Sequence, residues 1–229
     1  MRYVVTVDGL VGAGKTALSK QLAKRLGFVH FSSGIVYRAC GLLVMREKKD
    51  PEDEEEVLNL IRSASLKLAL KDSGTESTIL LNGEDVFSFL YSPEVSDYTS
   101  KIAKHPLVRK ELFPLQREAF LDRSLVAEGR DMGTVVFPDA LVKFFIVADD
   151  EVRVKRRLAQ LKESMPFLSS TQEALQKELW DRDKRDEERS VSPTKQAKDA
   201  VVIDNSSEPL EVVVDKMYKI VQKKLKEKA

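Results

Sequence analysis

The chain has 229 residues, 38 Lys plus Arg against 37 Asp plus Glu, and 42% hydrophobic residues, which is typical of one soluble globular domain, with or without a sizeable insertion. The balanced charge disfavours DNA or RNA as the main partner. The single cysteine, Cys40, excludes an intrachain disulfide, and no apolar run approaches the ~20 residues that a membrane-spanning helix needs. We therefore expect a cytoplasmic protein that binds neither a membrane nor a polymeric nucleic acid. We also expect it to be a monomer.

The N-terminal part of the chain alternates between strand and helix patterns. The expected elements are a buried strand, a glycine-rich turn, a helix, a second strand and a second helix, at residues 3–7, 9–16, 18–26, 28–31 and 37–45. Gly27 stands where a glycine commonly ends a helix, and Ser32 or Ser33 can cap the second helix. This order predicts the start of a parallel α/β sheet.

The next segment breaks this alternation. It is expected to contain a helix and two strands, at residues 51–64, 66–70 and 78–81. Leu66, Leu68 and Leu70 alternate with polar residues, as in a half-exposed strand, and Asn82-Gly83 is typical of a tight hairpin. We interpret this antiparallel segment as an insertion on one side of the core.

Alternation resumes after the insertion. The expected helices and strands lie at residues 93–103, 107–121, 125–127, 142–148, 150–162, 200–203 and 210–221. Met165-Pro166-Phe167 is expected to break a helix, and Ser170 with Glu173 forms a capping-box pattern for the next one. The side chains that we interpret as core members are Cys40, Phe144, Phe145 and Trp180.

Residues 9–16, Gly-Leu-Val-Gly-Ala-Gly-Lys-Thr, match the pattern G-x-x-x-x-G-K-[ST]. Glycines let the backbone curl so that its N–H groups point at one anion, and the following helix adds its positive N-terminal end. Lys15 can reach the β- and γ-phosphates of ATP, and Thr16 offers a hydroxyl to Mg²⁺. The alternative, a structural glycine turn, is disfavoured by the position between a buried strand and an amphipathic helix. We expect ATP at Gly9, Leu10, Val11, Gly12, Ala13, Gly14, Lys15, Thr16 and Ala17.

A kinase of a small acceptor is the favoured class of P-loop protein. The chain lacks the N-K-x-D string with which a GTPase binds guanine, and it is short for a motor ATPase. Such a kinase needs cations around two phosphates, and the arginine fork binds phosphate bidentately. Gly129-Arg130-Asp131 directly follows an expected strand, where open α/β sheets bind ligands. The alternative is a surface Arg–Asp pair in a turn.

Two helices carry further candidate arginines. The apolar stripe that begins at Leu175 and Leu179 continues onto Arg182, Asp186 and Arg189, which indicates charges facing a cleft, although a solvated face is the usual meaning of such a run. The other arginines share one helix face and fit a clamp on ATP phosphates and an ordinary solvated face equally well; they are Arg153, Arg156 and Arg157.

With these residues in view, the sequence resembles bacterial-type cytidylate kinase almost from end to end. The discriminating stretches are Ser-Gly-Ile-Val-Tyr-Arg at 33–38, Leu-Asn-Gly-Glu-Asp-Val at 81–86, the Glu-Gly-Arg-Asp stretch at 127–139, and Arg182-Asp183 with Asp186, Arg189, Ser192 and Pro193. Three positions depart from the family pattern: Ser32 in place of Asp, Leu90 in place of Arg, and Glu187 in place of a small residue.

The resemblance implies an α/β fold of the P-loop NTPase class, a parallel five-stranded core like that of nucleoside monophosphate kinases, with an acceptor-binding arm and a short lid. Its implied bounds are about 1–31, 122–152 and 171–229 for the core, 32–121 for the arm with its insertion and 153–170 for the lid. The implied contacts are Ser33, Tyr37, Arg38 and Arg130 on the acceptor phosphate, Ser100, Arg109, Asp131 and Arg189 around cytosine, and Arg182 and Asp186 on the ribose. The expected catalytic residues are Lys15, Arg130, Arg153 and Arg157.

The sequence therefore predicts an ATP:(d)CMP phosphotransferase that uses Mg²⁺. Asp131 can accept from the cytosine amine and Arg109 can donate to the N3 and O2 acceptors, whereas uracil would set a carbonyl against Asp131. The alternatives are a kinase for another nucleoside monophosphate, such as UMP or AMP, and an ATP-binding switch that hardly turns over.

Overall fold

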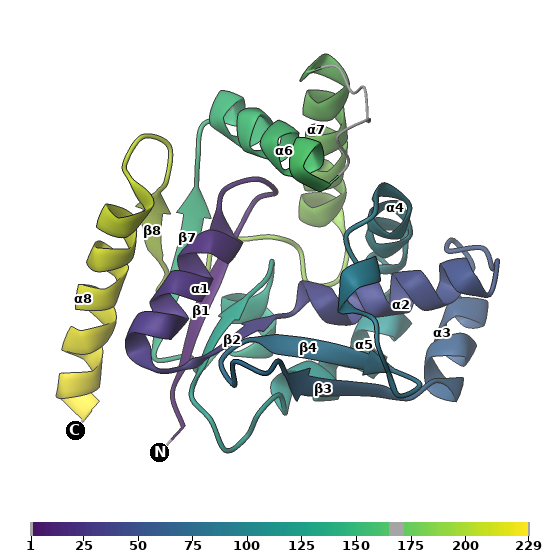
Figure 1. Cartoon of the computed structure of the whole chain (residues 1–229), viewed down its shortest axis with the longest axis horizontal. Coiled ribbons are helices and arrows are strands. Elements are labelled where there is room, and N and C mark those ends of the chain that lie inside the picture. Colours follow the sequence, from purple (N-terminus) through teal and green to yellow (C-terminus); the bar gives the residue numbers. More distant parts are fainter. Residues whose placement is uncertain (1, 165–171, 229) are drawn as a thin grey trace.

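A five-stranded parallel sheet forms the centre of the molecule (Figure 1). The computed structural model describes residues 2–164 and 172–228. The strand order is β2-β6-β1-β7-β8, with bounds Val4–Gly9 for β1, Val29–Ser32 for β2, Leu125–Glu128 for β6, Val142–Val147 for β7 and Val201–Asp204 for β8. The predicted parallel sheet is confirmed. Because β1 is central, the loop that follows it lies beside the carboxyl ends of β6 and β7.

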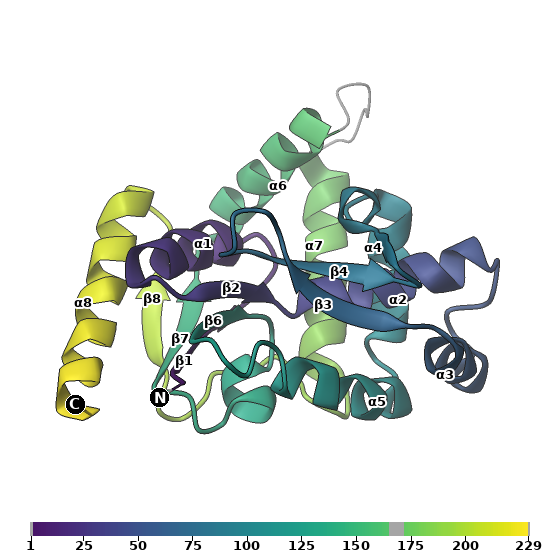
Figure 2. The same cartoon turned by 60° about the horizontal axis from the view of Figure 1, so that its bottom comes forward.

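Helices cover both faces of this sheet (Figure 2). On one face, α1 (Lys15–Leu26) and α8 (Leu210–Lys228) pack around apolar side chains of β1 and β7. On the other, α2 (Gly34–Arg46) and α5 (Pro106–Arg117) share a second cluster with β2 and β6. Gly27 ends α1 with a left-handed φ of 69°, as the sequence predicts. Because the two clusters hold the sheet from both faces, they also fix the positions of the loops at its carboxyl edge.

The predicted antiparallel segment lies within the stretch of chain between β2 and β6. After α2 this stretch contains α3 (Glu54–Ser63), a three-stranded antiparallel sheet of β3 (Leu66–Leu70), β4 (Ser77–Leu81) and β5 (Glu84–Asp85), a short 3₁₀-helix (Phe87–Phe89) and α4 (Pro93–Ile102). Asn82 and Gly83 have φ of 51° and 87°, so the tight hairpin is confirmed. The turn before β4 also touches the core, since His30 N donates to Thr75 O at 2.8 Å and Lys20 pairs with Glu76 at 2.9 Å.

Three further helices follow β6 and β7 in the chain. A π-helix, Met132–Val136, follows β6, and α6 (Asp150–Ser164) and α7 (Gln172–Glu188) precede β8. The predicted helix break at Met165-Pro166-Phe167 and the Ser170 end of the predicted capping box lie outside the described residues. The expected division into core, arm and lid stays a prediction. Within the described ranges, no helix combines the length and apolarity needed to cross a membrane.

Three local predictions were wrong or incomplete. Ser33 precedes α2 but makes no side-chain capping bond, because its backbone is already helical (φ −60°, ψ −26°) and does not aim the hydroxyl at the first turn. Trp180 is 52% exposed and is no core residue, and Phe145 is only partly buried. Cys40 and Phe144 are buried as predicted.

Candidate active site

A cleft of about 960 Å³ opens at the carboxyl ends of β1, β2 and β6. The loop between β1 and α1 forms one wall, and residues of α2, α4, α6 and α7 form the others. The sites that the sequence predicts for the phosphate donor and for the acceptor therefore share one cavity. This position agrees with the rule that open α/β sheets bind ligands beyond the carboxyl ends of their strands.

The glycine-rich loop has the geometry of an anion cradle. Gly14 has φ of 90°, and a Cβ there would lie 2.3 Å from Asn205 Nδ2, so only glycine fits. Helix α1 begins at Lys15, directly after this turn, and its first residues line the cleft, so the helix N-terminus is available to an anion there. Lys15 Nζ donates to Leu10 O at 2.5 Å. Burial, together with the charge of Arg130, holds the pKa of Lys15 well below its usual value, and the negative charge of an incoming phosphate would raise it.

Glu128, at the end of β6, is a candidate functional residue that the sequence interpretation missed. Thr16 Oγ1 donates to Glu128 Oε1 at 3.0 Å, and Ser19 Oγ donates to Glu128 Oε2 at 2.9 Å. Burial would raise the pKa of Glu128, but His30 (3.6 Å away) and Lys15 outweigh it and lower the pKa to about 2. An ionised carboxylate thus lies beside the hydroxyl that the sequence assigns to Mg²⁺. These are hard oxygen ligands of the kind that Mg²⁺ prefers, so the residues present fit the ion.

Arginines crowd the middle of the cleft. Arg38, Arg130, Arg157 and Arg182 all line it. Burial, with the charges of Arg38 and Arg130, lowers the pKa of Arg182 to about 9, and burial, with Arg157 and Arg130, lowers that of Arg38 to about 10. Both remain protonated at neutral pH. This concentration of positive charge is unfavourable until an anion enters, as expected of a site for phosphate.

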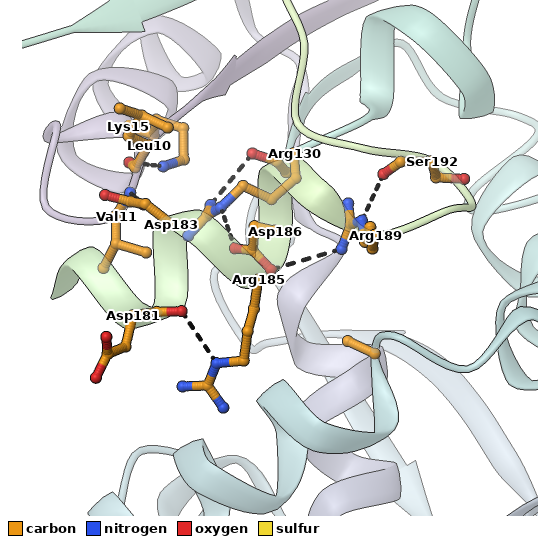
Figure 3. Close-up of polar contacts among 12 residues, drawn as sticks. Leu10, Val11, Lys15, Arg130, Asp181, Asp183, Arg185, Asp186, Arg189 and Ser192 are labelled. Atoms are coloured by element: carbon orange, nitrogen blue, oxygen red, sulfur yellow. Dashed lines mark hydrogen bonds and ion pairs between the residues drawn. The ribbon is translucent and has the colours of Figure 1, made fainter. Parts of the chain in front are cut away.

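The charged end of α7 faces the cleft (Figure 3). Leu175 and Leu179 are each 2% exposed, and the same stripe continues onto Arg182, Asp186 and Arg189, which line the cavity. Arg130 Nε donates to Asp186 Oδ2 at 3.1 Å, and Arg189 lies 3.6 Å from Asp186 Oδ1 (Figure 3). Burial would raise the pKa of Asp186, but Arg130 and its other arginine neighbours lower it. The stripe is thus a wall of the cleft and not a solvated face.

A buried polar pocket lies at the acceptor end. Asp131 and Arg109 form an ion pair through Oδ2 and NH2, and both side chains are 5% exposed. The Arg109 guanidinium also stacks over the Tyr37 ring, 5.0 Å from its centroid, and donates to Ala103 O at 3.1 Å. Within the described part of the chain, Ser100 Oγ, Arg109 Nε and Arg189 NH2 are buried without a hydrogen-bond partner. Buried polar atoms are rarely left unpaired, so this pocket is shaped for a polar ligand.

Asp8, at the end of β1, supports this pocket from below and was also missed from sequence. Its two carboxylate oxygens accept from Met132 N at 2.9 Å and Gly133 N at 2.7 Å, directly after Asp131. Burial raises the pKa of Asp8 to about 6, against the opposing effect of these two N–H groups. The carboxylate thereby joins the strand that leads into the glycine-rich loop to the segment that carries Asp131.

Comparisons with known proteins find relatives that cover nearly the whole chain. The cytidylate kinase family model matches residues 5–223. A cytidylate kinase from Mannheimia succiniciproducens is 40% identical over 97% of each chain, and one from Solibacter usitatus is 41% identical over 98% of this chain and 94% of its own. The chain belongs to the cytidylate kinase family. An uncharacterized protein from Eubacterium ventriosum shares the fold, with a TM-score of 0.50, 13% identity and coverage of 96% of this chain and 99% of its own.

Membership of the cytidylate kinase family confirms the predicted resemblance, and the structure locates the three departures from its pattern. Leu90 is fully buried, so its side chain does not face the cleft; only its carbonyl contributes, accepting from Arg38 at 2.8 Å. The next residue, Tyr91, lines the cleft with its ring 4.9 Å from the Arg38 guanidinium. Ser32 also lines the cleft, and Glu187 is exposed on α7.

The predicted lid arginines of this cytidylate kinase family member differ in position. Arg156 and Arg157 line the cleft, and Arg156 NH2 donates to Asn205 O at 2.7 Å. Arg153 is 4% exposed and contacts the glycine-rich loop from behind, with Nε donating to Val11 O at 2.7 Å. A contact between Arg153 and the transferred phosphoryl group stays a prediction. The hydrogen bond of Arg153 to Val11 O favours a role in holding the loop.

Proposed function

We propose that the chain transfers the terminal phosphoryl group of ATP to CMP or dCMP, giving ADP and CDP or dCDP. The observation that carries this proposal is the union, in one cleft, of the glycine-rich loop and the buried Asp131–Arg109 pair, with cationic side chains between them. A donor at the loop and an acceptor at the pair would bring their phosphates together at the arginines. Family membership supports the same activity.

The proposed reaction is a direct in-line transfer. An oxygen of the CMP phosphate attacks the γ-phosphorus of ATP, and the bond from that phosphorus to the β–γ bridging oxygen breaks, so that ADP leaves. The attacking oxygen is already ionised, so no general base is needed. Lys15, Arg130 and Arg157 neutralise charge on the transferring group. Arg38, with Ser33 and Tyr37, would hold the acceptor phosphate in line.

Thr16 and Glu128 are the residues that would hold Mg²⁺. When bound, the ion would act as a Lewis acid and neutralise negative charge on the β- and γ-phosphates. The carboxylate of Glu128 orients the Thr16 hydroxyl and adds a negative charge beside it, which favours a cation at this place. The remaining ligands would come from phosphate and water, as is usual for Mg²⁺.

The acceptor pocket supports recognition of cytosine. Asp131 is an acceptor for the N4 amine, while Arg109 and the unpaired Ser100 hydroxyl can serve the N3 and O2 atoms. Uracil would place a carbonyl against Asp131 and leave buried polar groups unpaired, which is costly. Arg182 and Asp186 would contact the sugar, so both ribose and deoxyribose are accepted through the 3′-hydroxyl they share.

Two further parts of the proposal concern where and how the protein works. We propose that it acts in the cytoplasm, as the curated relatives of the same length are named for a nucleotide-metabolising reaction. We also propose that it acts as a monomer, because one chain supplies both the donor and the acceptor walls of the cleft. Light scattering of the purified protein tests the second statement directly.

The test of the proposed function is product formation by the wild-type chain and by Lys15→Ala. ADP and CDP are quantified by chromatography after incubation with ATP, Mg²⁺ and CMP, and equal amounts of each are expected. Lys15→Ala should remain folded and lose about 10²-fold or more in turnover, the scale for losing a charge-stabilising donor. Binding of ATP with formation of neither ADP nor CDP would instead support the ATP-binding switch, and ADP without CDP would indicate ATP hydrolysis. A folded Lys15→Ala variant with near-normal turnover would refute the assignment of the loop.

A further inference from the structure

The backbone of Val11, at the tip of the glycine-rich loop, is held from both sides by charged side chains of α6 and α7. Val11 N donates to Asp183 Oδ1 at 3.0 Å, and Val11 O accepts from Arg153 Nε at 2.7 Å. Figure 3 shows Asp183 of α7 beside this loop. Arg153 and Asp183 are also paired with each other through NH2 and Oδ2, and their side chains are 4% and 10% exposed. The three residues thus form a closed, buried ring of hydrogen bonds.

The loop packs directly against α6 at the same point. A Cβ on Gly12 would lie 3.0 Å from Arg153 O and 3.2 Å from Arg153 Cβ, and Gly12 has φ of 74°. Val11, Val154 and Leu179 form a small apolar cluster beside the ring. Because the Val11 N–H is used by Asp183, phosphate must be bound by the amides that follow it in the loop. The ring therefore fixes the position of the loop without competing for those amides.

Charge neutrality is a requirement of this arrangement. Asp183 is a carboxylate in contact with a loop whose task is to bind phosphates, so alone it would repel the nucleotide. Arg153 cancels that charge through a buried pair. Its further bond, to Asp150 Oδ1 at 2.8 Å, reaches a carboxylate that is 55% exposed, so solvent screens that second negative charge. Arg153 does not line the cleft, unlike its neighbours Arg156 and Arg157.

We propose that Arg153 and Asp183 form a neutral clamp that positions the glycine-rich loop for ATP. They are positioning residues, since they act through the backbone of Val11. Asp183 lies one helical turn before Asp186, so α7 carries both a clamp residue and a wall of the acceptor end of the cleft. This inference rests on the proposed function, because the ligand that the loop awaits is taken to be ATP.

The experiment measures the Kd for ATP·Mg²⁺ by calorimetry in the absence of acceptor, and the Kd for CMP separately. Asp183→Asn keeps an acceptor for Val11 N but removes the charge, and should raise the ATP Kd three- to tenfold. Arg153→Met leaves an unpaired carboxylate against the loop and should raise it more than tenfold, the scale for a charged hydrogen bond. The double variant restores neutrality, so its ATP Kd should be lower than that of Arg153→Met alone.

The matched control is Asp199→Asn. It breaks another ion pair with a buried cation, Lys143 at 2.9 Å, at residues that do not line the cleft. It should leave both Kd values within twofold, and the clamp variants should leave the CMP Kd within threefold.

The proposal is overturned if the clamp variants change only the thermal unfolding temperature, or if the double variant binds ATP more weakly than Arg153→Met. Should Arg153→Met not fold, Asp183→Asn and the double variant still decide, since an unchanged ATP Kd in both overturns the clamp. A wild-type chain that binds no ATP·Mg²⁺ would instead contradict the proposed function itself.

Discussion

Replacing Arg182 by methionine should stabilise the protein while impairing its activity. The pKa of Arg182 falls from 12.5 to about 9 because of burial and the charges of Arg38 and Arg130. At 1.36 kcal/mol per unit, this difference corresponds to roughly 5 kcal/mol against the charged form in the folded state. The folded pKa is lowered, so this cost is fully present below pH 9 and is relieved only as the pH rises from about 9 toward 12.5.

The expected gain is smaller than the full cost, because methionine also loses the attraction of Arg182 to Asp186. We expect a net stabilisation of about 1–2 kcal/mol, or a rise in Tm of ~3–6 °C for a chain of this size. The measurement is thermal unfolding at pH 7.5, with and without CMP. Ligand should stabilise the wild type more than the variant, because the anion relieves repulsion that the variant no longer has. The kcat/KM for CMP should fall at least tenfold.

The matched control is Arg185→Met on the same helix. Arg185 is exposed, lies outside the cleft lining and donates to the backbone of its own helix, from Nε to Asp181 O at 3.1 Å (Figure 3). It should change neither the Tm nor kcat/KM appreciably. A destabilised Arg182→Met variant with unchanged kcat/KM would refute the reasoning, because Arg182 would then be an ordinary structural cation.

Three further predictions concern other parts of the cleft. Glu128→Gln should raise the Mg²⁺ concentration that gives the half-maximal rate about tenfold, as expected for a group that orients a metal ligand. The KM for CMP should stay within twofold, and an unchanged Mg²⁺ dependence would exclude this role for Glu128. Asp131→Asn should lower the ratio of kcat/KM for CMP to that for UMP; if the ratio is unchanged, Asp131 does not recognise the base. The kcat/KM for CMP should fall as the pH drops through about 6, because Asp8 then gains a proton and accepts weaker hydrogen bonds from Met132 N and Gly133 N. Asp8→Asn should remove that inflection, and its persistence would assign it to another group.

Much of the fold could be predicted because local pattern and tertiary structure agree. Val5 to Val7 before the glycine-rich loop and Leu18 and Leu22 of α1 are buried as their spacing requires. Asn82-Gly83 has the left-handed backbone that its tight hairpin needs. The stripe on α7 could be followed from Leu175 to Asp186 because helical periodicity fixes which side chains share a face.

The errors arise where a residue's role depends on another element. Trp180 follows Leu179 on α7, but one step along a helix turns the side chain away from the buried face, and its aromatic character alone does not bury it. Helical spacing alone could not separate Arg153 from Arg157, because the partners of Arg153 are Val11 and Asp183, far away in sequence. Glu128 was missed for the same reason, since its functional role depends on its contact with Thr16, which is also far away in sequence.

The central claim is that this cleft phosphorylates cytidine monophosphates in preference to other nucleoside monophosphates. The most direct test is the initial rate of ADP formation by the wild-type chain with ATP·Mg²⁺ and, in turn, CMP, dCMP, UMP, dUMP and AMP, each over a range of concentrations. The structure predicts kcat/KM values for CMP and dCMP at least tenfold above those for the other acceptors, because uracil offers no amine to Asp131 and adenine offers no counterpart of the cytosine O2 acceptor to Arg109. Equal or higher kcat/KM for UMP or AMP, or ADP formation that does not depend on an acceptor, would contradict the claim.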